Sequence, residues 1–212
     1  HFGGNVYSIS EAARAHSMGL DSLIGIPMKV AGSLLIGFLI YGIILAETGG
    51  GKFFIDIAES IMGKYRGGPA KVAILASGFF GMLSGSPTSN VITSGSLTIP
   101  AMKKAGYPGR YAAAIEACAS TGGVLMPPVM GTVAFIMASF LNLPYSDILL
   151  AALIPGLIFY IALIIQTDLY AAKNNLKGMD LNKIPKFLPT IINGFPYIIS
   201  FISLIWLIIS AK

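Results

Sequence analysis

The sequence predicts an all-α, polytopic membrane protein that contains a re-entrant helical hairpin and a discontinuous transmembrane helix. Of its 212 residues, 55% are hydrophobic and only 11% are charged, whereas about a quarter of the residues in a soluble domain are charged. Several long stretches carry no ionisable side chain, among them the stretch between Lys71 and Lys103. Two of the apolar stretches are interrupted by Gly, Pro, Ser and Thr, which disfavour regular helix.

Composition also limits the classes of function. The net charge is +5, but Lys and Arg cluster at the ends of apolar segments, as membrane topology requires, so we expect no nucleic-acid partner. The single cysteine, Cys118, and the two histidines, His1 and His16, give neither a zinc-ligand cluster nor a Ser/His catalytic pair. We therefore predict a protein that is not an enzyme and has no cofactor.

Residues 1–66 are predicted to form an N-terminal unit with three parts. Residues 1–28 favour a short helix at the membrane interface, and the charge-free segment 30–46 is just long enough to span the bilayer. Residues 49–51 are glycines and should end that helix. In residues 52–66, apolar side chains recur at helical spacing with charges between them. This pattern fits an amphipathic helix on the membrane surface or a connector helix that faces solvent.

Residues 67–141 are predicted to be a transport-type unit that opens with a re-entrant hairpin at 69–104. Its centre, Leu83–Gly95, reads LSGSPTSNVITSG, and irregular chain survives in a bilayer only where it lines a protein-walled or watery cavity. Two short helices, at 72–83 and 91–102, would each reach about halfway across a core of ~30 Å. Both outer ends are basic, so both should lie in the cytoplasm, with the polar tip near the middle of the membrane.

The broken helix of this unit is predicted at 109–141, which as one helix would be about 50 Å long. Ser120–Gly123 and then Met126–Pro128 interrupt it, and paired Gly and paired Pro are strong break signals. Residues 142–212 should hold further transmembrane helices. Clean apolar segments at 148–167 and 187–210 flank a basic segment that returns to the cytoplasm.

Together the two breaks predict a binding site. Freed backbone carbonyls with Ser, Thr and Asn oxygens suit a small hard cation, and the N-termini of half-helices suit a carboxylate. Glu116 is the only acidic or basic residue within 111–141. It could bind a cation or a proton; alternatively, it lies near the cytoplasmic end and pairs with Arg110 or a loop lysine.

Two stretches closely resemble a known family: residues 51–108, which run from GKFFIDIAES to MKKAGYP, and residues 116–138, EACASTGGVLMPPVMGTVAFIMA. They resemble the DctM-like large permease subunit of tripartite ATP-independent periplasmic (TRAP) transporters. Within that family they look most like the fused-permease branch that works with TAXI-type binding proteins. The resemblance runs from about Ile24 to the C-terminus.

The resemblance implies an elevator-type secondary transporter in the bacterial inner membrane. It would couple uptake of dicarboxylates or other organic anions to Na⁺, with substrate delivered by a periplasmic binding protein. Partners would be the small membrane subunit, or fused helices that replace it, and the lipid bilayer. Only one hairpin and one broken helix are present, so the chain should correspond to one of two inverted repeats and require the missing second repeat. It would be a fragment, a truncated product or one chain of a split assembly.

The resemblance also assigns site residues by position. For Na⁺ these are Ser84, Gly85, Ser89, Asn90, Thr121 and Gly123; for substrate they are Ser86, Thr88, Ser89, Gly122 and Gly123. Two alternatives remain at this stage, namely proton coupling through Glu116 and a pore lined by the two breaks. A channel usually repeats one such loop around an axis, so a pore axis would distinguish it.

Overall fold

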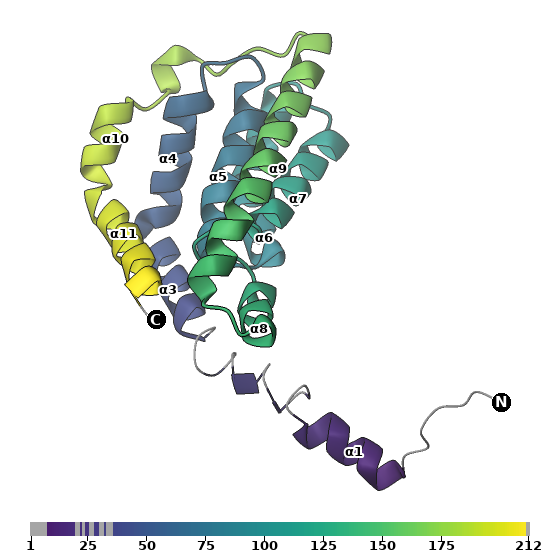
Figure 1. Ribbon diagram of the computed structural model, residues 1–212. Helices are drawn as coiled ribbons and strands as arrows, with labels where there is room; N and C mark the ends of the chain where they lie inside the picture. The colour runs from purple at the N-terminus through teal and green to yellow at the C-terminus, as the bar shows by residue number, and fades with distance from the viewer. Residues whose placement is uncertain are drawn as a thin grey trace, which may run out of the picture.

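The computed structural model describes residues 8–19, 22, 24, 25, 28, 29, 32 and 36–210, and all regular structure in them is helical (Figure 1). The longer helices are α1 (Ile9–Met18), α3 (Ile36–Leu45), α4 (Gly51–Met62), α5 (Gly68–Ser84), α6 (Pro87–Lys104), α7 (Gly109–Gly123), α8 (Thr132–Leu141), α9 (Tyr145–Lys173), α10 (Phe187–Asn193) and α11 (Phe195–Ser210). A π-helical turn, Ala46–Gly50, joins α3 to α4, and a 3₁₀ turn, Leu181–Lys183, precedes α10.

Two helical segments are long and apolar enough to cross a membrane, namely Ile36–Met62 and α9. A third candidate is the bent pair that ends in α11. Within the described residues the structure is therefore that of a polytopic membrane protein, as predicted. The segment predicted at 148–167 is confirmed within α9, which extends beyond it at both ends.

The final span is not the single helix predicted at 187–210. The chain bends by 59° between Leu181–Asn193 and Phe195–Ser210. At the bend, a Cβ on Gly194 would lie 1.8 Å from Cε2 of Phe53, so only glycine allows α4 to approach the backbone this closely. Pro196 follows directly and suits the first turn of a new helix.

The N-terminal unit differs from its prediction in how α3 and α4 are joined. Residues 30, 31 and 33–35 of the predicted span 30–46 lie outside the described residues. Gly49, with φ 104°, bends the chain, but helix resumes at once at Gly51. Phe53, Phe54 and Ala58 of α4 are buried, and α4 packs along α5 and α10. Its apolar face is thus largely covered by protein. The two alternatives predicted for this helix, on the membrane surface or facing solvent, did not include this packing. The short helix expected near the start is α1, none of whose residues is buried.

The predicted hairpin is present, with α5 and α6 side by side (Figure 1), but its helices are longer than predicted. They have 17 and 18 residues, about 26 Å each at 1.5 Å per residue. Only Gly85 and Ser86 separate them, because the side chain of Ser86 accepts a hydrogen bond from the N–H of Ser89 and Pro87 occupies the first turn. The predicted irregular tip is therefore mostly the first turn of α6.

The stretch predicted as one discontinuous helix contains two helices, α7 and α8, separated by residues 124–131. The backbone of this break is bonded to neighbouring elements: the N–H of Val129 donates to the Met82 carbonyl of α5 over 3.2 Å. The Tyr145 hydroxyl lies 2.9 and 2.7 Å from the carbonyls of Pro128 and Val129. The glycines 122 and 123 remain helical, so the prolines that follow them, not the glycines, end α7.

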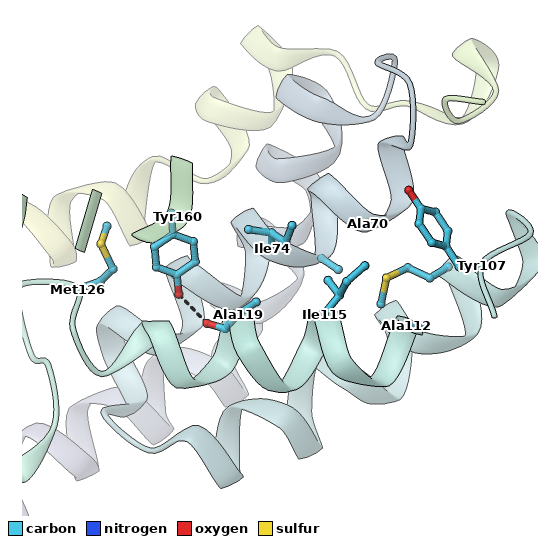
Figure 2. Packing of buried hydrophobic residues seen from close by; sticks show 10 residues of the cluster. Ala70, Ile74, Tyr107, Ala112, Ile115, Ala119, Met126 and Tyr160 are labelled. Carbon is cyan, nitrogen blue, oxygen red and sulfur yellow. Dashed lines mark hydrogen bonds between the residues drawn. The ribbon is translucent and has the colours of Figure 1, made fainter. Parts of the chain in front are cut away.

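Helices α5, α6, α7 and α9 enclose a core of small and apolar side chains. Ala70 and Ile74 of α5 face Ala112, Ile115 and Ala119 of α7 (Figure 2). The Tyr160 hydroxyl of α9 closes this core by donating to the Ala119 carbonyl over 2.7 Å. Farther along α5, a Cβ on Gly81 would lie 2.2 Å from Cα of Gly123. Because neither position carries a side chain, α5 and α7 are in backbone contact there.

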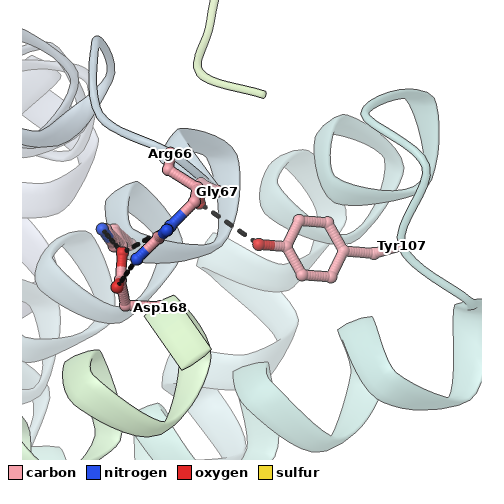
Figure 3. Close-up of polar contacts among 5 residues, drawn as sticks. Arg66, Gly67, Tyr107 and Asp168 are labelled. Atoms are coloured by element: carbon pink, nitrogen blue, oxygen red, sulfur yellow. Dashed lines mark hydrogen bonds and ion pairs between the residues drawn. The ribbon is translucent and has the colours of Figure 1, made fainter. Parts of the chain in front are cut away.

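The end of the hairpin opposite its tip, which we call the hairpin base, consists of Arg66, Lys71, Tyr107 and Asp168. Asp168 of α9 pairs with Arg66 and with Lys71, the latter at 2.5 Å, and Tyr107 donates to the Gly67 carbonyl over 3.3 Å (Figure 3). Burial raises the pKa of Tyr107 to about 12, so its phenol stays protonated. The base joins the loops on either side of the hairpin to the end of α9.

Candidate functional site

The hairpin tip lies between two cavities. One, which we call the polar cavity after the hydroxyl and amide groups that line part of it, measures about 250 Å³ and lies between α3, α5 and α6, although most of its wall is apolar. Its polar lining consists of Ser84, Ser86, Ser89, Asn90 and Thr93. Four of these five residues are predicted site residues; Thr93 was not predicted. The rest of the wall is apolar side chains and Gly42.

The second cavity is larger and mostly apolar, at about 640 Å³. It is lined by Gly85 and Pro87 of the tip, by the break from Val124 to Gly131, and by the first turns of α8 and α9. A Cβ on Gly85, which has φ 57°, would lie 2.2 Å from the Met130 carbonyl oxygen. The tip and the break are thus in direct contact, although they are distant in sequence.

Asn90 connects the two predicted halves of the site. Its side chain is 1% exposed, lines the polar cavity and donates to the Ser77 carbonyl of α5 over 2.8 Å. A Cβ on Gly123 would lie 3.3 Å from Nδ2 of Asn90, so the missing side chain at 123 makes room for the amide. This contact places the first turn of α6 against the last turn of α7.

The other predicted residues do not all share this location. Gly122 faces α9, because a Cβ there would lie 2.2 Å from Cε1 of Phe159. Thr121 is exposed and bonds to the Ala117 carbonyl of its own helix, and Thr88 is exposed outside the polar cavity. Only Gly123 of the three α7 residues meets the hairpin.

Glu116 is fully buried, and its carboxylate contacts four hydroxyl groups. Ser77 lies 2.7 Å and Ser120 3.3 Å from Oε1, Ser94 also contacts Oε1, and Thr98 lies 2.5 Å from Oε2. The predicted alternative of a pair with Arg110 or a loop lysine is wrong, since α7 turns Glu116 toward the hairpin while Arg110 is exposed.

The sequence analysis did not identify these four hydroxyl residues. A signal was present, because Asn90, Ser94 and Thr98 recur every four residues and share one face of α6. Glu116 and Ser120 have the same spacing on α7. Which faces meet depends on how the helices pack, and periodicity alone does not fix this.

No charged side chain lines the polar cavity. The described residues also contain no group of three or more His, Cys, Asp or Glu that could hold a metal ion. Hydroxyl, amide and carbonyl oxygens are what this cavity offers, and neutral oxygen ligands of this kind suit a weakly held, hard monovalent cation.

A polytopic helical protein whose polar residues gather at a hairpin tip and a helix break has the architecture of membrane transporters with discontinuous helices. Residues 4–212 match the family described as "Tripartite ATP-independent periplasmic transporter, DctM component". The chain belongs to this family. This is a family of multi-pass permeases of the bacterial inner membrane, not of enzymes.

Several curated relatives are similar to this chain. The C4-dicarboxylate TRAP transporter large permease protein DctM of Pseudomonas aeruginosa is 32% identical over 142 residues, which cover 67% of this chain and 33% of the relative. The corresponding protein of Vibrio cholerae is 35% identical over 144 residues, 68% of this chain and 31% of the relative. The isethionate TRAP transporter permease protein DctMQ of Oleidesulfovibrio alaskensis is 31% identical over 141 residues, 66% of this chain and 22% of the relative. These matches span about a third of each relative's length or less.

Proposed function

We propose that this chain supplies one half of the transport site of a TRAP permease that couples uptake of a carboxylate or related organic anion to Na⁺. The observation that carries this proposal is the position of Asn90. It lines the polar cavity and packs against Gly123, so it joins the hairpin tip to the wall formed by α7.

The Na⁺ ligands would come from the tip. Ser84, Ser89 and Asn90 line the polar cavity, whereas Gly85 lines the second cavity and would contribute its backbone carbonyl from that side of the tip. Of the predicted α7 ligands, the contact with Asn90 favours Gly123 over the exposed Thr121. Neutral ligands leave the bound ion with its positive charge, which would attract a substrate carboxylate.

The substrate would bind beside this ion. Ser86 and Ser89 line the polar cavity. In the first turn of α6, Pro87 has no N–H and the N–H of Ser89 donates to Ser86, so the N–H of Thr88 is the donor left at the positive end of the helix dipole. The relatives named for C4-dicarboxylates and isethionate support an organic anion as substrate. A periplasmic binding protein, of TAXI type if the fused branch is correct, would deliver it, and a second inverted repeat and small-subunit helices would complete an elevator-type permease.

Transport by the complete permease tests this proposal. Uptake of a panel of labelled carboxylates would be measured in proteoliposomes with the cognate binding protein, with and without an inward Na⁺ gradient. Asn90→Ala should lower Na⁺-dependent uptake about tenfold, because one lost buried ligand contact is worth about 1.4 kcal/mol. Ser89→Ala should raise the half-saturating Na⁺ concentration while leaving the fold intact, since Ser89 is exposed.

Ser96→Ala is the matched control, because Ser96 is an exposed serine of the same helix that lies outside the polar cavity. The proposal fails if uptake does not depend on Na⁺, or if Ser96→Ala and Ser89→Ala shift the Na⁺ dependence equally.

A further inference from the structure

Glu116 is a buried carboxyl group with no positively charged partner among the residues that the structure describes. It is 0% exposed, and its four hydrogen-bonding neighbours Ser77, Ser94, Thr98 and Ser120 are at most 5% exposed. An ionised carboxylate in such a place is costly unless its charge is balanced. The four hydroxyl groups supply hydrogen bonds but no charge that would balance it.

Counting hydrogens indicates what neutralises this carboxyl group. Each hydroxyl has one hydrogen to donate, yet Thr98 Oγ1 lies 2.5 Å from Oε2 of Glu116 and 3.1 Å from the Ser94 carbonyl oxygen. A carboxylate would compete with that carbonyl for the single hydrogen of Thr98. If Oε2 carries a proton, it donates to Thr98, and Thr98 donates to the Ser94 carbonyl. Both contacts are then satisfied.

The cluster leaves no room for a larger cation. The hydroxyl oxygens touch the carboxyl group directly, and none of the cavities described above is lined by Glu116 or its four partners. Gly95 also packs against the glutamate, because a Cβ there would lie 3.0 Å from Cγ of Glu116. A proton is the one cation that needs no space of its own.

We propose that Glu116 is a proton-binding site, with the proton on Oε2 shared with Thr98. The helices around it bring no competing charge. Lys71 of α5 pairs with Asp168 of α9, Lys103 and Lys104 of α6 are exposed in its last turn, and Arg110 of α7 is exposed. Tyr160 of α9 approaches from the other side and donates to the Ala119 carbonyl.

Proton binding at this site is linked to the packing of the hairpin against α7. The hydroxyls come from α5, α6 and α7, so the carboxyl group can reach water only if these helices separate. Ser94 contacts both Glu116 and Oδ1 of Asn90, the latter at 3.2 Å, and Asn90 lines the polar cavity. The hairpin therefore holds the proton while it is packed against α7, and it releases the proton when it separates from α7. This inference does not rest on Na⁺ coupling.

Infrared spectroscopy of the complete permease at neutral pH tests the proposal. A protonated carboxyl group has a C=O stretching band that a carboxylate lacks. The spectrum of the wild type minus that of Glu116→Gln should contain this band, in buffer with or without Na⁺. The matched control Glu47→Gln removes an exposed carboxylate and should produce no such difference.

Thr98→Val allows a second assignment of the carboxylic-acid band, in a protein that still contains Glu116. It removes the proposed acceptor of the proton, so the band should shift to higher frequency. The proposal is overturned if the wild-type and Glu116→Gln spectra coincide in the carboxylic-acid region, or if the band is present without Na⁺ and vanishes when Na⁺ is added. These outcomes are independent of the uptake measurements above.

Discussion

The two ends of the α5–α6 hairpin are held by different chemistry. At the base, Asp168 pairs with Lys71 and Arg66, and Tyr111 stacks on Tyr170 with ring centroids 3.7 Å apart. At the tip, contacts are neutral and the packing is interrupted by cavities on both sides. Charge pairs and stacked rings hold the base, whereas small residues and hydroxyl groups surround the tip. Glu116 lies between these ends and is satisfied by hydroxyls alone.

The largest expected effect comes from replacing the carboxyl group of Asp168 by an amide, a change that should have little effect at Glu116. Asp168→Asn should destabilise the protein by about 2 kcal/mol, because it leaves the largely buried Lys71 without a counter-charge. Glu116→Gln should change stability by less than about 0.5 kcal/mol, because an amide resembles the protonated acid in shape and charge. Thermal unfolding in detergent would measure both. If Asp168→Asn and Glu116→Gln lose equal stability, the distinction between a charged hairpin base and a neutral cluster around Glu116 is contradicted.

Gly95→Ala should destabilise by about 1.5 kcal/mol through overpacking, because the new methyl group would press on Cγ of Glu116 at 3.0 Å. Gly109→Ala is the matched control, since its nearest neighbour is the flexible end of Lys103 at 3.8 Å. The same unfolding measurement applies. If both alanine variants unfold at the wild-type temperature, Glu116 is packed less tightly than described.

Ser77→Ala should cost about 1 kcal/mol, the usual net value of a buried hydrogen bond. It removes the hydroxyl that donates to Oε1 of Glu116 over 2.7 Å. Ser60→Ala is a suitable comparison, because Ser60 bonds only to a carbonyl of its own helix, that of Ile57. If Ser77→Ala loses no more stability than Ser60→Ala, the hydrogen bonds around Glu116 do not stabilise the packing of the helices.

The smallest effect is expected at Arg66. Its side chain is 51% exposed, so Arg66→Ala should lower thermal stability only slightly. Salt should reduce that difference, because exposed charges are screened. Unfolding at low and high salt would show this, and a large salt-independent loss would mean that Arg66 packs as a structural side chain.

How far the sequence predicts the fold differs between these regions. The breaks after Ser84 and after Gly123 can be predicted from local sequence, because Gly, Ser and Pro disfavour continued helix. The structure has both breaks. Helix lengths at the tip were underestimated because Ser86 and Pro87 disfavour helix interiors but begin a helix well. The bend at Gly194 depends on the approach of Phe53 from a distant helix, which no local pattern encodes.

The candidate site, too, could be predicted only where local sequence determines it. Ser84, Ser86, Ser89 and Asn90 lie in the polar interruption of an apolar run and were assigned through the resemblance to the TRAP family, and they do share one cavity. The partners of Glu116 were missed, because Ser77, Thr98 and Ser120 sit in regular helix where hydroxyls usually bond to their own backbone. Their role follows from the packing of three helices. The direction of Gly122 toward α9 likewise depends on tertiary structure.

Thiol labelling at the tip tests the central claim, that the hairpin tip binds the coupling ion, most directly. In the complete permease, with Cys118→Ser removing the native exposed thiol, Ser89→Cys would be labelled by a membrane-permeable maleimide with and without Na⁺. We expect Na⁺ to slow labelling of Ser89→Cys several-fold and to leave Ser96→Cys unchanged. Labelling of Ser89→Cys that is indifferent to Na⁺, or protection of both positions alike, would contradict the account.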